Sequence, residues 1–173
     1  MSTPTIQQIT VLGAGTMGHG IAQVAAMSGF ETVLFDIDAE ALDRGLSRVQ
    51  GNLEKGVQRG KVTEDLRDET LARLSGTHVL SDAVEDADLV IEAAPERMDI
   101  KTAIFRQLDE LAPPHAILAT NTSSLSVSTI AESVRDSTRV VGMHFFNPVH
   151  ILKLLEVVCA RQTATEVLAT VQD

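Results

Sequence analysis

The sequence contains one cysteine, Cys159, among its 173 residues. A single cysteine cannot form a disulfide within the chain or build a Cys-rich metal site, so we predict no metal centre. Because Cys159 follows the apolar residues Val157 and Val158, we expect it to be buried as a small apolar side chain.

Positive charge is also scarce, since 14 Lys and Arg residues face 24 Asp and Glu residues and the net charge is −10. The electrostatic field of a chain with this negative charge repels nucleic acids and anionic membranes. No apolar run reaches the roughly 18 residues of a transmembrane helix. Residues 1–5 lack the basic and apolar regions of a signal peptide. We therefore expect a cytoplasmic protein that binds neither nucleic acid nor membrane.

Apolar residues make up 44% of the sequence, enough to build the core of one domain over residues 1–173. Alternating strand and helix patterns predict an α/β protein of the Rossmann type, with a doubly wound, mostly parallel sheet and helices on both faces. Two strands at the start of the chain are followed by strands expected at 78–80, 89–93, 117–120, 140–144 and 152–158. Helices are expected at 38–59, 64–74, 100–111, 127–133 and 163–171.

A glycine-rich turn, Gly13-Ala14-Gly15-Thr16-Met17-Gly18, follows the first apolar strand. Gly13 permits a tight turn, Gly15 lets the backbone approach a pyrophosphate, and Gly18 lets the next helix pack closely. Asp36 ends the second strand, where a carboxylate accepts from both ribose hydroxyls and repels the 2′-phosphate of NADP. The pattern predicts NAD as the cofactor. A glycine turn that binds nothing is the alternative, and it leaves Asp36 unexplained.

Polar side chains gather near the ends of the later strands. If the chain turns at Pro148, the next strand runs beside that of His144 and brings Glu156 within reach of the imidazole. The carboxylate would hold the ring tautomer and stabilise its protonated form, as a general base requires. Ser123 offers a hydroxyl to a substrate oxygen. The alternative is a core histidine satisfied by local polar partners.

Four motifs in order resemble the L-3-hydroxyacyl-CoA dehydrogenase family, including the bacterial 3-hydroxybutyryl-CoA dehydrogenases. The resemblance covers the whole chain and rests on residues 13–22, 90–96, 121–125 and 142–149. It implies that His144 is the catalytic base and that Glu156 pairs with it. It also implies that Ser123 contacts both substrate and cofactor.

The same resemblance implies four further NAD contacts, from Asp36, Glu96, Lys101 and Asn147. Glu96 and Lys101 also fit an alternative in which both are ordinary surface charges at the start of a helix. The implied reaction is the oxidation of an (S)-3-hydroxyacyl-CoA to the 3-oxoacyl-CoA, with hydride passing to NAD.

Members of this family continue into an all-helical C-terminal domain. That domain supplies the dimer interface, much of the acyl pocket and a catalytic asparagine, and residues 1–173 do not contain it. We therefore expect a homodimer for the complete enzyme. This chain alone should bind NAD, turn over little substrate and self-associate through an apolar surface that includes Ile151, Leu152, Leu154 and Leu155.

Basic residues recur at helical spacing within 38–59, inside an arc of roughly 60°. They are Arg44, Arg48, Lys55 and Arg59. This row could hold the phosphates of CoA, with Arg48, Lys55 and Arg59 as candidates. An ordinary solvated face is the alternative, and Gly45, Gly51 and Gly56 should weaken the helix that carries the row.

Three other functions remain open. A Ser-His-Glu hydrolase would use Ser123, His144 and Glu156, but the serine lacks the glycines of a nucleophile elbow. A related dehydrogenase could act on a CoA-free 3-hydroxy acid with the same site. A non-catalytic NAD-binding or structural module would bind NADH without turnover.

Overall fold

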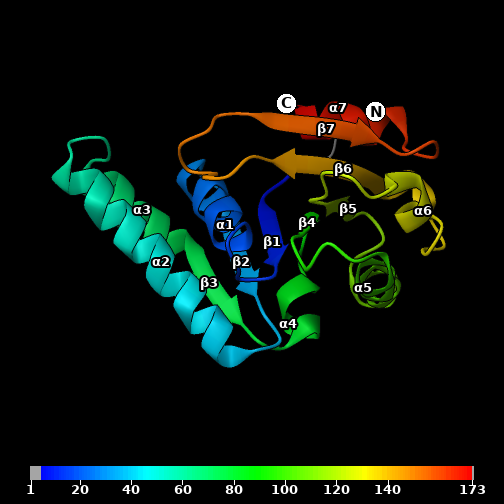
Figure 1. Ribbon diagram of the computed structural model, residues 1–173, viewed down its shortest axis with the longest axis horizontal. Helices are drawn as coiled ribbons and strands as arrows, with labels where there is room; N and C mark the ends of the chain where they lie inside the picture. The colour runs from blue at the N-terminus through cyan, green and yellow to red at the C-terminus, as the bar shows by residue number, and fades with distance from the viewer. Residues whose placement is uncertain (1–4, 173) are drawn as a thin grey trace.

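Short apolar strands pair in one seven-stranded sheet, seen here in a computed structural model that describes residues 5–172 (Figure 1). The strands are β1 (Gln8–Leu12), β2 (Glu31–Phe35), β3 (Leu74–Thr77), β4 (Leu89–Glu92), β5 (Ile117–Thr120), β6 (Val140–Phe145) and β7 (Leu155–Cys159). Their order is β3-β2-β1-β4-β5-β6-β7, and only the β6–β7 pair is antiparallel. The predicted Rossmann-type sheet is confirmed.

Helices cover both faces of this sheet (Figure 1). They are α1 (Gly18–Met27), α2 (Ala39–Gln58), α3 (Glu64–Arg73), α4 (Leu80–Val84), α5 (Met98–Leu111), α6 (Val127–Ala131) and α7 (Thr165–Gln172), with a short 3₁₀ helix at Ser137–Arg139. Helices α4, α5 and α6 pack on one face, and α1, α2 and α7 pack on the other. Neighbouring strand residues are therefore both buried, as Val11 and Leu12 show by facing opposite cores.

Within residues 5–172, no helix combines the length and apolar character needed to cross a bilayer. Residues 1–4, which entered the prediction that the chain lacks a signal peptide, lie outside the described residues.

Two strand predictions were wrong in position. The strand expected at 78–80 is Leu74–Thr77, which pairs with β2, while Leu80 already begins α4. This edge strand lacks a strong apolar pattern, and a Cβ on Gly76 would come 2.9 Å from Leu46 Cδ1 of α2. The strand expected at 152–158 begins only at Leu155, the partner of Phe145, the last residue of β6.

The predicted burial of Cys159 was also wrong, because its thiol is exposed. Cys159 is the last residue of β7, which lies at the edge of the sheet and has a neighbouring strand on one side only. Apolar neighbours in the sequence predict a buried strand, but an edge strand is covered less completely than an inner one.

The glycines of α2 differ in their surroundings. Gly45 is buried against the glycine-rich turn, where a Cβ would lie 2.8 Å from both the Cβ and the carbonyl oxygen of Ala14. Gly51 has open space, with no heavy atom within 4 Å of an added Cβ. Gly45 therefore lets α2 approach the turn, and the prediction that it only weakens the helix was incomplete.

This difference gives a paired stability prediction. Gly51→Ala should raise the free energy of unfolding by about 0.5–1 kcal/mol, because alanine loses less backbone entropy in a helix. Gly45→Ala should lower it by about 1–3 kcal/mol, because the added methyl overpacks a closed contact. Urea unfolding measures the free energy of unfolding of each variant, and the values are compared where the m-values agree. Equal gains at both positions would contradict the contact described for Gly45.

Candidate active site

The glycine-rich turn joins β1 to α1 and has the shape that the sequence predicted. Gly13 has φ +98°, and a Cβ there would come 2.8 Å from the carbonyl oxygen of Ala93. A Cβ on Gly18 would overlap the carbonyl oxygen of Gly13, so only glycine lets α1 start this close. Gly15 and Thr16 are exposed, and a Cβ on Gly15 would meet no atom within 4 Å. The turn is therefore packed at its two ends and open at its middle.

Asp36 directly follows β2 and lies beside this turn. Its Oδ2 accepts from the Ala14 N–H at 2.9 Å, and its Oδ1 accepts from the Asp38 N–H at 3.0 Å. A carboxylate has about four acceptor positions, so two remain for the hydroxyls of a ribose. Asp36 thus holds the turn, a structural role that the sequence pattern did not reveal.

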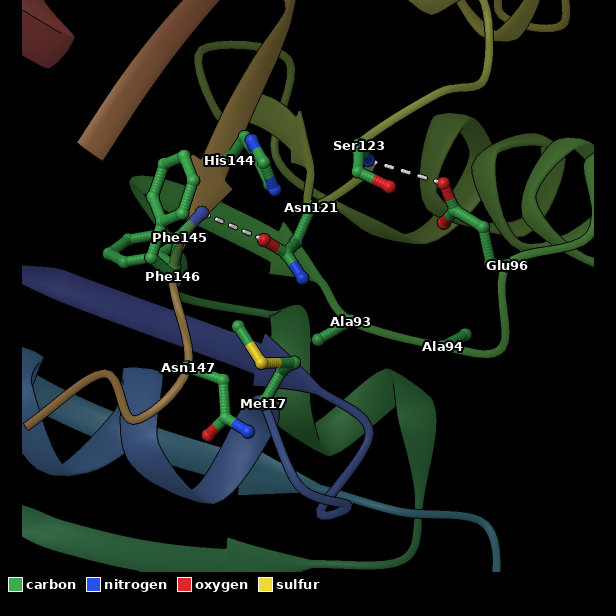
Figure 2. A pocket seen from close by; sticks show the side chains of 10 residues that line it. All are labelled: Met17, Ala93, Ala94, Glu96, Asn121, Ser123, His144, Phe145, Phe146 and Asn147. Atoms are coloured by element: carbon green, nitrogen blue, oxygen red, sulfur yellow. Dashed lines mark hydrogen bonds between the residues drawn. The ribbon is translucent and has the colours of Figure 1, made fainter. Parts of the chain in front are cut away.

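A pocket of about 410 Å³ opens where the carboxyl ends of β4, β5 and β6 meet the start of α1 (Figure 2). Its size falls within the range of about 300–1,000 Å³ that is typical of small-molecule sites. It is lined by Met17, Ala93, Ala94, Glu96, Asn121, Ser123, His144, Phe145, Phe146 and Asn147. Five predicted site residues from separate parts of the chain meet here: Met17, Glu96, Ser123, His144 and Asn147.

His144 and Glu156 form a cross-strand pair on β6 and β7. Nδ1 of His144 lies 2.9 Å from Oε2 of Glu156, as expected from a chain reversal near Pro148. Because an ionised carboxylate only accepts, Nδ1 is the nitrogen that donates to Glu156, and in the neutral imidazole Nε2 then keeps its lone pair. Figure 2 shows the second ring nitrogen directed into the pocket, and the Phe146 ring lies beside the imidazole at a centroid distance of 4.5 Å.

Glu96 holds the loop that carries Ser123. Its Oε1 accepts from the Ser123 N–H at 3.2 Å, from the Thr122 hydroxyl and from the Ser124 hydroxyl at 3.4 Å. Burial raises the pKa of Glu96, but the Thr122 hydrogen bond, the charge of Lys101 and the loop N–H groups together hold that pKa below its usual value. Glu96 is therefore an ionised group that orders the Ser123 loop and also lines the pocket.

Lys101 does not lie on the surface, so its interpretation as an ordinary exposed charge was wrong. Its side chain is 0% exposed, and its Nζ lies 2.8 Å and 2.9 Å from the two carboxylate oxygens of Glu92. Nζ is also 3.5 Å from Oε2 of Glu96. Lys101 is not among the residues that line the pocket, and its contact with NAD stays a prediction.

Sequence reasoning assigned no role to Glu92 and no specific role to Asn121. Glu92 is a fully buried carboxylate, and its signal was an acidic residue ending the apolar run Leu89–Glu92. Asn121 lines the pocket, and its Oδ1 accepts from the Phe145 N–H at 3.0 Å. Its signal was its place directly after β5, the position where ligand-facing residues of such sheets occur.

The basic row lies on α2 and outside the pocket. Arg48, Lys55 and Arg59 are exposed, while Arg44 pairs with Asp38 at 3.9 Å and with Glu40 at 3.6 Å. A helix of this length extends about 30 Å.

The comparison with known proteins agrees with this geometry. Residues 8–173 match the family model of the 3-hydroxyacyl-CoA dehydrogenase NAD-binding domain. A 3-hydroxyadipyl-CoA dehydrogenase from Escherichia coli strain K12 is 47% identical over 163 residues, which are 94% of this chain and 34% of that protein. A probable 3-hydroxybutyryl-CoA dehydrogenase from Bacillus subtilis strain 168 is 45% identical over 168 residues, 95% of this chain and 58% of that protein.

A solved structure extends the likeness to the fold. The crystal structure of an (S)-3-hydroxybutyryl-CoA dehydrogenase from Ralstonia eutropha matches with a TM-score of 0.94 and 38% identity, over 97% of this chain and 59% of that chain. The chain thus spans about a third to three fifths of the length of these relatives. With its sheet, its glycine-rich turn and the match over residues 8–173, the chain belongs to the 3-hydroxyacyl-CoA dehydrogenase family, as the NAD-binding domain of that family.

Proposed function

We propose that this domain binds NAD and serves, within a longer protein, the oxidation of (S)-3-hydroxyacyl-CoA to 3-oxoacyl-CoA. The observation that carries the proposal is the His144–Glu156 pair, which directs a ring nitrogen into a pocket beside the glycine-rich turn. A histidine held in this way suits the removal of a hydroxyl proton next to a nucleotide.

The residues present fit NAD. The open middle of the turn at Gly15 and Thr16 leaves room for a pyrophosphate at the start of α1, between the packed positions Gly13 and Gly18. Asp36 would accept from the adenosine ribose. Bound NAD accepts a hydride, and its nicotinamide end would lie in the pocket, near Met17, Glu96, Ser123 and Asn147.

Proton transfer would fall to His144. Its Nε2 would take the substrate hydroxyl proton, and Glu156 would stabilise the imidazolium that results. The Ser123 hydroxyl would donate to the substrate oxygen, because its loop is fixed by Glu96 while Ser123 itself lines the pocket. General base catalysis of this kind contributes about 10²–10⁴-fold to the rate.

The same proposal covers how the CoA part of the substrate and the protein partners would be bound. Arg48, Lys55 and Arg59 are exposed and would meet the phosphates of CoA. Ile151, Leu152 and Leu154 are 62%, 45% and 55% exposed and would pack against the rest of a longer chain, whereas Leu155, expected to be exposed with them, is partly buried in the core. We also propose a homodimer for the longer enzyme and a cytoplasmic location.

Cofactor choice is the first test. This chain should bind NADH at least about tenfold more tightly than NADPH, or about 1.4 kcal/mol. Asp36→Asn should reduce that ratio, because the amide still accepts from the Ala14 N–H but no longer repels a 2′-phosphate. Asp38→Asn, two residues along at the start of α2, is the matched control and should preserve it. Fluorescence titration measures both affinities, and equal affinities in the unchanged chain would remove the role given to Asp36.

The proton-transfer roles are tested in the full-length parent enzyme. His144→Gln should lower turnover of a 3-hydroxyacyl-CoA by about 10²–10⁴-fold with little change in NADH affinity. Glu156→Gln should act in the same direction less severely, because the ring keeps a hydrogen-bond partner without the charge. Near-normal turnover in the His144 variant would make this histidine a structural residue.

The chain by itself should bind NADH but turn over acetoacetyl-CoA at under about one per cent of the rate of the full-length parent, because the substrate is poorly positioned and open to water. It should also self-associate through its exposed apolar residues at high concentration, as sedimentation would show. Parent-like turnover by a monodisperse monomer would contradict this expectation. Free 3-hydroxybutyrate, assayed with the parent, distinguishes a CoA-free hydroxy acid dehydrogenase.

A further inference from the structure

The aromatic ring of Phe146 lies beside the imidazole of His144. The two ring centroids are 4.5 Å apart, and the ring planes meet at 46°. Both residues line the pocket (Figure 2). Tilted pairs of aromatic rings with centroids about 4.5–7 Å apart attract each other, so this is a favourable contact. In the proton transfer described above, Glu156 alone stabilises the imidazolium, and the contact with Phe146 has no part.

The alternation of side chains along β6 explains why these two rings meet. Successive side chains of a strand point to opposite faces, so residues two apart share a face. His144 lies in β6, and Phe146 directly follows the end of that strand. Phe145, between them, packs against the core on the face that α1 and α7 cover. The direction of β6 therefore brings Phe146 to the imidazole.

The imidazole of His144 gains a positive charge in the proposed reaction. When Nε2 takes the substrate hydroxyl proton, the O–H bond breaks, its electron pair stays on the oxygen, and an N–H bond forms on the ring. The His144 side chain is 20% exposed, so water solvates this charge incompletely. Loss of water disfavours the charged form of a histidine unless a neighbouring group compensates for it.

The carboxylates near His144 leave room for a further contribution. Glu156 pairs with Nδ1, but its side chain is 56% exposed, and water screens its charge. Glu96 also lines the pocket, and its Oε1 is already bonded to the Ser123 loop. The faces of an aromatic ring carry partial negative charge and attract a cation within about 6 Å of the ring centroid. The ring of Phe146 lies within that distance of the imidazole.

We propose that Phe146 acts through His144, as a positioning residue whose ring holds the imidazole and stabilises its imidazolium form by a cation–π contact. The inference rests on the proposed function, because it assumes that His144 is the general base. The ring attracts the imidazolium more strongly than the neutral imidazole. It therefore speeds proton removal and leaves the affinities for substrate and cofactor nearly unchanged.

The test changes the charge distribution of the ring in the full-length parent, with (S)-3-hydroxybutyryl-CoA as substrate. Phe146→Leu should lower the single-turnover rate of NADH formation about two- to tenfold, with the dissociation constant for NADH within about twofold of the parent value. Phe146→Tyr keeps the ring and should keep the rate. Pentafluorophenylalanine at position 146 keeps the ring shape but reverses the charge of its faces. It should lower the rate at least as far as leucine does.

Phe30→Leu is the matched control for the loss of a phenyl ring. Phe30 is also half-buried, but it precedes β2, at the end of the sheet away from the pocket. This variant should lower the melting temperature and leave the single-turnover rate unchanged. A packing role for Phe146 predicts the parent rate with pentafluorophenylalanine, because that side chain fills the same space, and this result would overturn the proposal. The parent rate in Phe146→Leu would overturn it as well.

Nuclear magnetic resonance separates this inference from the proposed function, because it needs neither cofactor nor substrate. A nearby aromatic ring shifts proton signals, so the ring signals of His144 should move in Phe146→Leu. Those of His115, which pairs with Asp88 just before β4, should stay in place. If the parent does not oxidise the hydroxyacyl-CoA, the proposed function fails, and the signals still decide whether the two rings are in contact. Unmoved His144 signals would overturn the contact and the inference with it.

Discussion

The close approach of α1 to the turn before it is the constraint on which the site depends. Gly18 packs on the carbonyl of Gly13, and Gly13 in turn packs on the carbonyl of Ala93, so neither position has room for a side chain. These two contacts set how far the start of α1 lies from the end of β4. Ala93 and Met17 both line the pocket. Backbone packing, and not the polar side chains, therefore sets the width of the pocket between them.

Polar side chains then fix the loops around this frame. Asp36, Glu96 and Asn121 each accept from a backbone N–H of another segment, at Ala14, Ser123 and Phe145. Each keeps further acceptor or donor capacity. Glu96 and Asn121 also line the pocket, so these two side chains both order the loops and face the site, as in a preorganised site.

The antiparallel β6–β7 pair has a separate consequence. Direct cross-strand pairing places Glu156 opposite His144, so one residue from each strand suffices to orient the imidazole. Because β7 lies at the edge of the sheet, the Glu156 side chain is 56% exposed. Within residues 5–172 this carboxylate is therefore open to water.

Local patterns in the sequence determined the fold class, the shape of the glycine-rich turn, the place of Asp36 at the end of β2 and the pairing of His144 with Glu156. Each of these depends on neighbours along the chain or on one reversal near Pro148. Only the tertiary structure decided the burial of Lys101, the exposure of Cys159 and the place of β3. Lys101 lies on a helix whose pattern is amphipathic, and its partners come from the ends of β4 and β5. Burial of a charge is set by how such distant segments meet, and no local pattern encodes that meeting.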